Sequence, residues 1–147
     1  MSNAFRILAL FAAALAGGTA SAETVVVKAQ GVKFIPDIIR ANVGDVIAFR
    51  NMAAQSVAGV PGMWPEGAPE MRSGIGADYD YPIEREGLYV VKSPPHWGAR
   101  MGAVIAVGDP AGLAAKVAEY ETLAATDGEA KPAAGLLKKF RERMGLK

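Results

Sequence analysis

The sequence contains no cysteine and only one histidine, His96, among its 147 residues. The absence of cysteine excludes disulfides, thiolate zinc sites, iron–sulfur clusters and cysteine nucleophiles. A single histidine likewise excludes metal motifs and acid–base pairs that need two imidazoles. Neither sign of charge is in excess, with 16 Lys+Arg against 15 Asp+Glu. Nucleic acid is therefore not an expected partner, because its binders usually carry a basic face.

The first 22 residues have the pattern of a secretory signal. Arg6 supplies a short positive region, and residues 7–16 form an unbroken apolar run that is too short to span a bilayer. Residues 20–22 are Ala-Ser-Ala, which matches the small-residue pattern of a cleavage site. We therefore expect a signal peptide over residues 1–22 and a mature periplasmic domain over residues 23–147, with no membrane contact after cleavage.

Short β-branched or alternating segments, separated by turn residues, predict about seven strands and a β-sandwich. The expected strands cover residues 24–29, 33–41 with a break at Pro36, 46–51, a short piece near 56–58, 78–83, 88–92 and 102–107. Pro82 predicts that the strand over 78–83 lies at a sheet edge. Residues 52–76 form a long loop rich in glycine and proline, and such loops are often functional.

The pattern changes to helix after residue 109. Asp109 and Pro110 have the residue types of an N-cap and a first helical position. Apolar residues then recur at helical spacing, which predicts two helices that pack on the sandwich, the second over residues 132–144. The apolar positions are Leu113, Val117, Tyr120, Leu123 and Ala124 in the first helix and Leu136, Leu137, Phe140 and Met144 in the second. Basic residues near the end of the second helix suit either a solvated helix end or a docking surface.

Residues 89–102 carry a resemblance to a known family. The spacing Ser93-x2-His96-x4-Met101, followed by Gly102 and a strand, resembles the ligand loop of cupredoxins, specifically of pseudoazurins. Gln55 stands where pseudoazurins have their first histidine, and residues 43–45, 62–68 and the two C-terminal helices are also similar. The resemblance covers residues 23–147. It implies a mainly β fold, a cupredoxin-like Greek-key β-sandwich with two C-terminal α-helices.

The same resemblance identifies four ligand positions for type 1 copper: Gln55, Ser93, His96 and Met101. Such a centre needs two imidazoles and a thiolate in one plane with a weak axial thioether. His96 and Met101 are retained, but a glutamine replaces one histidine and a serine replaces the cysteine. A serine hydroxyl stays protonated at neutral pH and cannot form the copper–sulfur bond. We therefore expect no type 1 copper.

Two hypotheses remain for the retained ligands. His96 and Met101 form a weak copper site, helped by Met63 or Met71, since thioethers and imidazole suit Cu(I). Alternatively, His96 is a structural histidine with local hydrogen bonds, which the small number of ligands favours.

The favoured function is a periplasmic binding or accessory module that uses the former copper-end loops to bind a protein partner. We expect the partner surface to contain Trp64, Trp97, Met63 and Pro95. For the two tryptophans, the alternative is that they fill space left by the missing metal site. The alternative function is copper-binding electron transfer with an altered site. An enzyme is not expected, because Ser93 and His96 lack a third carboxylate and a nucleophile-elbow pattern.

Overall fold

The computed structural model describes residues 21–109 and 111–147, so the predicted signal peptide lies outside the described residues except for Ser21 and Ala22. The elements in chain order are β1 (Thr24–Gln30), β2 (Lys33–Ile35), β3 (Ile38–Ala41), β4 (Val46–Arg50), β5 (Ala58–Gly59), β6 (Tyr79–Pro82), β7 (Gly87–Lys92), η1 (Pro94–Ala99), β8 (Gly102–Val107), η2 (Ala111–Leu113), α1 (Ala114–Thr126) and α2 (Ala133–Met144).

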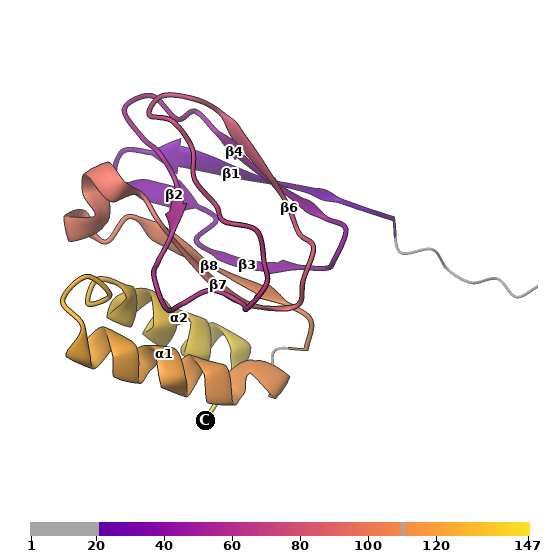
Figure 1. The fold of residues 1–147 in the computed structure, drawn as a ribbon, viewed down its shortest axis with the longest axis vertical. Coiled ribbons are helices and arrows are strands. Elements are labelled where there is room, and N and C mark those ends of the chain that lie inside the picture. The colour runs from indigo at the N-terminus through magenta and orange to yellow at the C-terminus, as the bar shows by residue number, and fades with distance from the viewer. Residues whose placement is uncertain (1–20, 110) are drawn as a thin grey trace, which may run out of the picture.

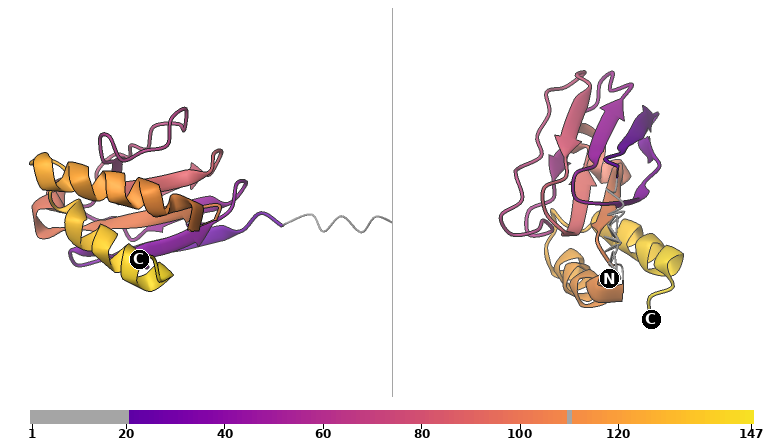
Figure 2. Two further views of the ribbon diagram at one scale, coloured as in Figure 1. Left: turned by 90° about the horizontal axis from the view of Figure 1, so that it is seen from below. Right: turned by 90° about the vertical axis from the view of Figure 1, so that its right-hand side faces the viewer.

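The molecule has three layers. One four-stranded sheet has the order β2-β1-β4-β6 and faces a second with the order β3-β8-β7-β5. The two α-helices cover the outer face of the second sheet, side by side (Figures 1 and 2). Strands β1 and β4 are parallel, as are β3 and β8, while the other pairs are antiparallel.

The central strands β7 and β8 are buried on both faces, which explains their unbroken apolar sequence. In β7, Leu88 and Val90 pack toward the helices, whereas Tyr89 and Val91 pack toward the opposite sheet. All six residues of β8 are buried. In β1, by contrast, Val27 is buried while its neighbour Val26 is 45% exposed, as expected for a sheet with one solvated face.

The predicted strands agree with the structure in position, with one split. Residues 33–41 divide near Pro36 into β2 and β3, which belong to different sheets, so there are eight strands rather than about seven. The short piece predicted near 56–58 is β5, and β6 lies at a sheet edge as Pro82 indicated.

The two helices bury most of the stripes that their sequences predict, while Leu113, Leu123 and Met144 are partly buried. Helix α1 buries Val117, Tyr120 and Ala124, and α2 buries Leu136, Leu137 and Phe140. The Tyr120 hydroxyl donates to the carbonyl of Leu88 at 2.9 Å, and its burial raises the pKa of that phenol. No helix in the described ranges is long and apolar enough to cross a membrane.

The start of the first helix differs from the prediction. Pro110 lies outside the described residues, and the 3-10 turn η2 precedes α1, whose N-cap position is Leu113 rather than Asp109.

Two of the basic residues near the end of α2 form intramolecular ion pairs. Lys139 pairs with Asp37 at 2.7 Å, and Arg141 pairs with Glu121 at 2.8 Å. These contacts join α2 to the segment before β3 and to α1.

Candidate functional site

The candidate site lies where strands from both sheets end. Strand β4 leads to Gln55, and β7 leads directly to Ser93, so two residues far apart in sequence meet at one end of the sandwich. The backbone N–H of Ser93 donates to the carbonyl of Met101 at 2.8 Å. This bond extends the β7–β8 ladder, and the loop between them folds into the 3-10 helix η1 (Figure 1). Pro94 and Pro95 fit its first turn, where no backbone donor is needed.

One side-chain oxygen organises the site. Oε1 of Gln55 accepts a hydrogen bond from Oγ of Ser93 at 2.8 Å and lies 2.8 Å from Nδ1 of His96. The other end of the amide is fixed, because Nε2 of Gln55 donates to the carbonyl of Gly31 at 3.2 Å. A flipped amide would set an oxygen against that carbonyl, so the orientation of Gln55 follows from its surroundings.

This orientation fixes the histidine tautomer. Since Oε1 of Gln55 can only accept, Nδ1 of His96 carries the proton and donates. Any lone pair of the neutral ring is then on Nε2. A metal could use Nδ1 only after this hydrogen bond is broken and the proton has moved.

The network is closed and mostly buried. Ser93 and Met101 are 0% exposed and Gln55 is 6% exposed, while His96 is half-buried. Within the described ranges, every buried side-chain nitrogen and oxygen has a hydrogen-bond partner. Nor does any group of three or more His, Cys, Asp or Glu side chains in that part of the chain lie close enough to hold a metal ion.

The predicted partner surface is only partly exposed. Pro95 is exposed and Trp64 is half-buried, but Met63 is 0% exposed and Trp97 is 8% exposed. Both buried residues pack in the core between the second sheet and the helices. The prediction that Met63 and Trp97 lie on an exposed surface is therefore wrong, because the helical tail covers them.

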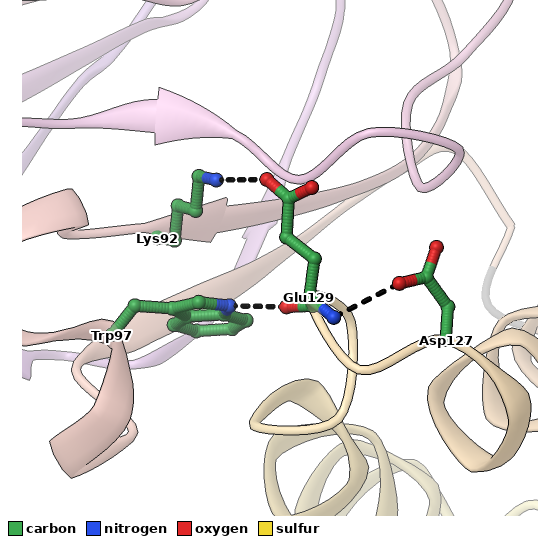
Figure 3. A network of polar contacts seen from close by, with 4 residues as sticks. All are labelled: Lys92, Trp97, Asp127 and Glu129. Atoms are coloured by element: carbon green, nitrogen blue, oxygen red, sulfur yellow. Dashed lines mark hydrogen bonds and ion pairs between the residues drawn. The ribbon is translucent and has the colours of Figure 1, made fainter.

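Trp97 joins the loop of residues 93–101, here called the former ligand loop, to the helical tail formed by α1 and α2. Its Nε1 donates to the carbonyl of Glu129 at 2.6 Å, in the turn between α1 and α2 (Figure 3). The carboxylate of Glu129 pairs with Lys92 at 2.8 Å, and the backbone N–H of Glu129 donates to Asp127 at 2.9 Å. The turn is thus held to the residues on either side of Ser93.

Trp64 belongs to a separate aromatic cluster. Its ring meets Tyr89 and Tyr81 edge to face at centroid distances of 4.8 and 5.8 Å. It also lies against Gly59, where an added Cβ would come within 2.8 Å of the ring. Burial raises the pKa of Tyr81 to about 12. A cavity of about 390 Å³ opens beside Trp64, Met71 and Lys92, and its lining does not include Gln55, Ser93 or His96.

Two exposed apolar residues adjoin the network, and sequence reasoning missed them. Val32 follows Gly31 and is 44% exposed, and Ile75 precedes Gly76 and is 72% exposed. The carbonyl of Gly31 accepts a hydrogen bond from the side chain of Gln55, and the N–H of Gly76 donates to the backbone carbonyl of Gln55 at 2.9 Å. No periodic pattern marks either residue, so only the fold places them at this end.

Comparison with known sequences gives a partial match. No protein-family model matches the chain. Pseudoazurin from Paracoccus pantotrophus is 36% identical over 77 residues, which are 52% of this chain and 53% of that protein. The chain spans about half the length of the curated relatives it matches.

Solved structures match over a longer range. Pseudoazurin from Methylobacterium extorquens AM1 aligns with a TM-score of 0.62 and 25% identity, covering 79% of this chain and 98% of that one. Pseudoazurin from Hyphomicrobium denitrificans aligns with a TM-score of 0.65 and 26% identity, over 79% and 97% of the two chains. This chain has the cupredoxin fold and is similar to pseudoazurins. The two-sheet sandwich with two C-terminal helices agrees with the fold that the sequence predicted.

The donor set at the ligand positions of this pseudoazurin-like chain does not fit type 1 copper. Three of the four positions converge through side-chain hydrogen bonds, namely Gln55, Ser93 and His96, while the backbone of Met101 bonds to Ser93 and His96 at the end of the same loop. They offer a hydroxyl, an amide oxygen, a thioether and a ring nitrogen that already donates. None of these is the thiolate that the centre requires.

Proposed function

We propose that this pseudoazurin-like chain is an exported binding or accessory module that works without type 1 copper. The observation that carries the proposal is the shared oxygen of Gln55, which binds Ser93 and His96 where the family pattern places metal ligands. A metal site that lost its metal would leave buried polar groups without partners, and each such group costs about 1–3 kcal/mol of folding free energy. Here those groups form hydrogen bonds with one another, so this cost does not arise.

The proposed contact surface surrounds this network. It consists of five residues that are exposed or half-buried: Val32, Ile75, Pro94, Pro95 and His96. Val32 also lines a small cavity with Ala99 and Arg100 of the former ligand loop, which places it beside η1. Apolar residues around a half-buried polar centre suit a protein partner.

Metal loading tests the central claim. The purified mature protein, with His96→Ala as control, is mixed with Cu(II) or Cu(I), and the visible spectrum and bound copper are measured. We expect no intense charge-transfer band and less than stoichiometric copper for both proteins. Stoichiometric, redox-reversible copper that is lost in His96→Ala would overturn the proposal in favour of an altered copper site.

Restoring the ligands tests whether the scaffold is preserved. Gln55→His combined with Ser93→Cys supplies the imidazole and thiolate, and both side chains start from positions already in contact. We expect the double variant to bind copper and turn blue, while each single variant does not. A colourless double variant that still folds would show that the loops have moved from the geometry of a copper site.

Crosslinking tests the surface. A photoreactive amino acid at Ile75, 72% exposed, is compared with one at Val43, 53% exposed and at the opposite end of β4. In periplasm we expect a discrete adduct from position 75 and none from position 43. Equal labelling at both ends would contradict a partner surface at the former copper end.

A further inference from the structure

Asp45 is an almost buried carboxylate, and within residues 21–109 and 111–147 its side chain bonds only to backbone donors. It is 4% exposed, and its two oxygens accept from the N–H of Glu23 at 2.9 Å and of Asn42 at 2.8 Å. These bonds lower the pKa of Asp45, that from Glu23 most. No Lys or Arg in the described residues forms an ion pair with it. A charge withdrawn from water in this way favours a cation as partner.

The position of the Glu23 nitrogen is fixed by the sheet. Thr24 and Val46 are paired at the start of the parallel strands β1 and β4, and the N–H of Val46 donates to the carbonyl of Glu23 at 2.9 Å. The backbone of Asp45 is held in turn by Ile83, whose N–H donates to it at 2.8 Å. The nitrogen and the carboxylate therefore stay adjacent as long as the sandwich is folded.

We propose that cleavage between Ala22 and Glu23 turns this hydrogen bond into an ion pair, so that removal of the leader itself strengthens the mature fold. The proposal rests on the export part of the proposed function. The predicted cleavage site rests on the sequence pattern of residues 20–22, whereas the place of the carboxylate rests on the packing around Asp45.

The chemistry needs only water. Hydrolysis breaks the amide C–N bond between Ala22 and Glu23, and the hydroxyl of water adds to the carbonyl carbon of Ala22. That carboxylic acid releases its proton, and the nitrogen of Glu23 gains two protons in all, becoming an ammonium. An α-amino group has an ordinary pKa of about 7.7–8.0, so it is mainly charged at neutral pH.

The site of cleavage matters to within one residue. A chain that begins at Ala22 keeps an amide at Glu23 and carries its charge one residue farther away, about 3.8 Å along the chain. A chain that begins at Thr24 lacks the nitrogen altogether. Only a start at Glu23 places the ammonium 2.9 Å from the oxygen of Asp45.

Charges of both signs lie on the segments around Asp45. Glu84 follows Ile83 and Glu23 carries its own carboxylate, while Arg85 follows Glu84 and Arg40 stands two residues before Asn42. Neither arginine forms an ion pair with Asp45.

A thermodynamic cycle tests the ion pair. Chains 23–147 and 21–147 are released from a fusion by a protease that leaves no extra residues, each with Asp45 or with Asp45→Asn. The longer chain is the matched control, because it keeps the hydrogen bond without the charge. In urea unfolding at pH 7 and low salt, we expect the folding equilibrium constant of chain 23–147 to be at least fivefold larger than that of chain 21–147 when both carry Asp45. When both carry Asp45→Asn, we expect the two constants to agree within twofold. Equal constants in the Asp45 pair would overturn the proposal.

A second measurement does not depend on the Asn variant folding. The α-amino pKa of chain 23–147 is followed by NMR, and we expect it to be higher in the folded protein than in the same chain unfolded in urea. An unchanged or lower value would overturn the ion pair. Mass analysis of the chain recovered from periplasm separately tests processing after Ala22; if processing fails there, the export claim fails while the cycle still decides the ion pair.

Discussion

At the scale of single residues, Gln55 determines the chemistry of the former ligand positions. Its Oε1 accepts hydrogen bonds from Ser93 and His96, and its Nε2 donates to the carbonyl of Gly31. The glutamine therefore does more than occupy the place of an imidazole. It sets the tautomer of the one histidine and satisfies a hydroxyl that is 0% exposed.

Removing this shared acceptor has a larger effect than removing one donor. Gln55→Leu leaves the buried hydroxyl of Ser93 without its hydrogen-bond acceptor, and we expect this variant to lower the free energy of unfolding by about 1–3 kcal/mol. Ser93→Ala leaves Oε1 bonded to His96, and we expect a loss of about 1 kcal/mol or less. Urea unfolding at pH 7 measures both. If Ser93→Ala costs more than Gln55→Leu, the oxygen of Gln55 is not the centre of the network.

At the scale of elements, the former ligand loop is held in place by packing against its own exit. Trp97 points inward from η1, and Gly102 at the start of β8 leaves room for its ring. An added Cβ at Gly102 would lie 2.8 Å from the ring of Trp97 and would also meet the carbonyl oxygen of Val91. The absence of a side chain at Gly102 is thus a requirement of the loop.

A pair of glycine substitutions tests this packing. Gly102→Ala forces the loop or the strand to shift, and we expect it to lower the free energy of unfolding by about 1–3 kcal/mol. Gly98→Ala is the matched control in the same loop, since no atom lies within 4 Å of its added Cβ. We expect the control to change stability by no more than about 0.5 kcal/mol. Equal losses in the two variants would mean that the close packing around Gly102 does not hold the loop.

At the scale of the whole molecule, the helical tail is part of the sandwich. The second sheet contributes Leu88, Val90 and Val104 to the core beneath the helices, and α2 contributes Phe140, which is 0% exposed. The turn between the helices is also tied to Lys92 and Trp97 (Figure 3). The tail therefore covers apolar residues that would otherwise face water.

This packing predicts that the tail and the sandwich unfold together. Phe140→Ala should lower the free energy of unfolding by about 3–5 kcal/mol, because it leaves a cavity in that core. Met144→Ala, at a half-buried position, should cost clearly less. Helical circular dichroism and the fluorescence of a Trp97→Phe variant, whose remaining tryptophan Trp64 packs in the sandwich, should give coincident transitions in urea. Loss of helix before the fluorescence changes would contradict a single cooperative unit.

Local patterns sufficed for most of the fold. The β-branched run of β1, the apolar runs of β7 and β8, and the helical stripe that ends at Met144 all predicted elements of the right type and place. These features reflect burial repeated at a fixed spacing, which a sequence displays directly. The start of α1 was less predictable, because the turn η2 has no such period.

The sequence by itself determined that no thiolate is available to this chain, since it contains no cysteine. Its resemblance to a cupredoxin ligand loop implied that two of the four ligand positions are replaced. The tertiary structure decided what the replacements do. The bonds from Gln55 to Gly31, Ser93 and His96 span 24, 38 and 41 residues, so no local pattern contains them. The tertiary structure also determines that Met63 and Trp97 are buried and that Val32 and Ile75, next to the Gln55 network, are exposed. The reason is that the packing of helices and loops decides which apolar side chains reach the surface.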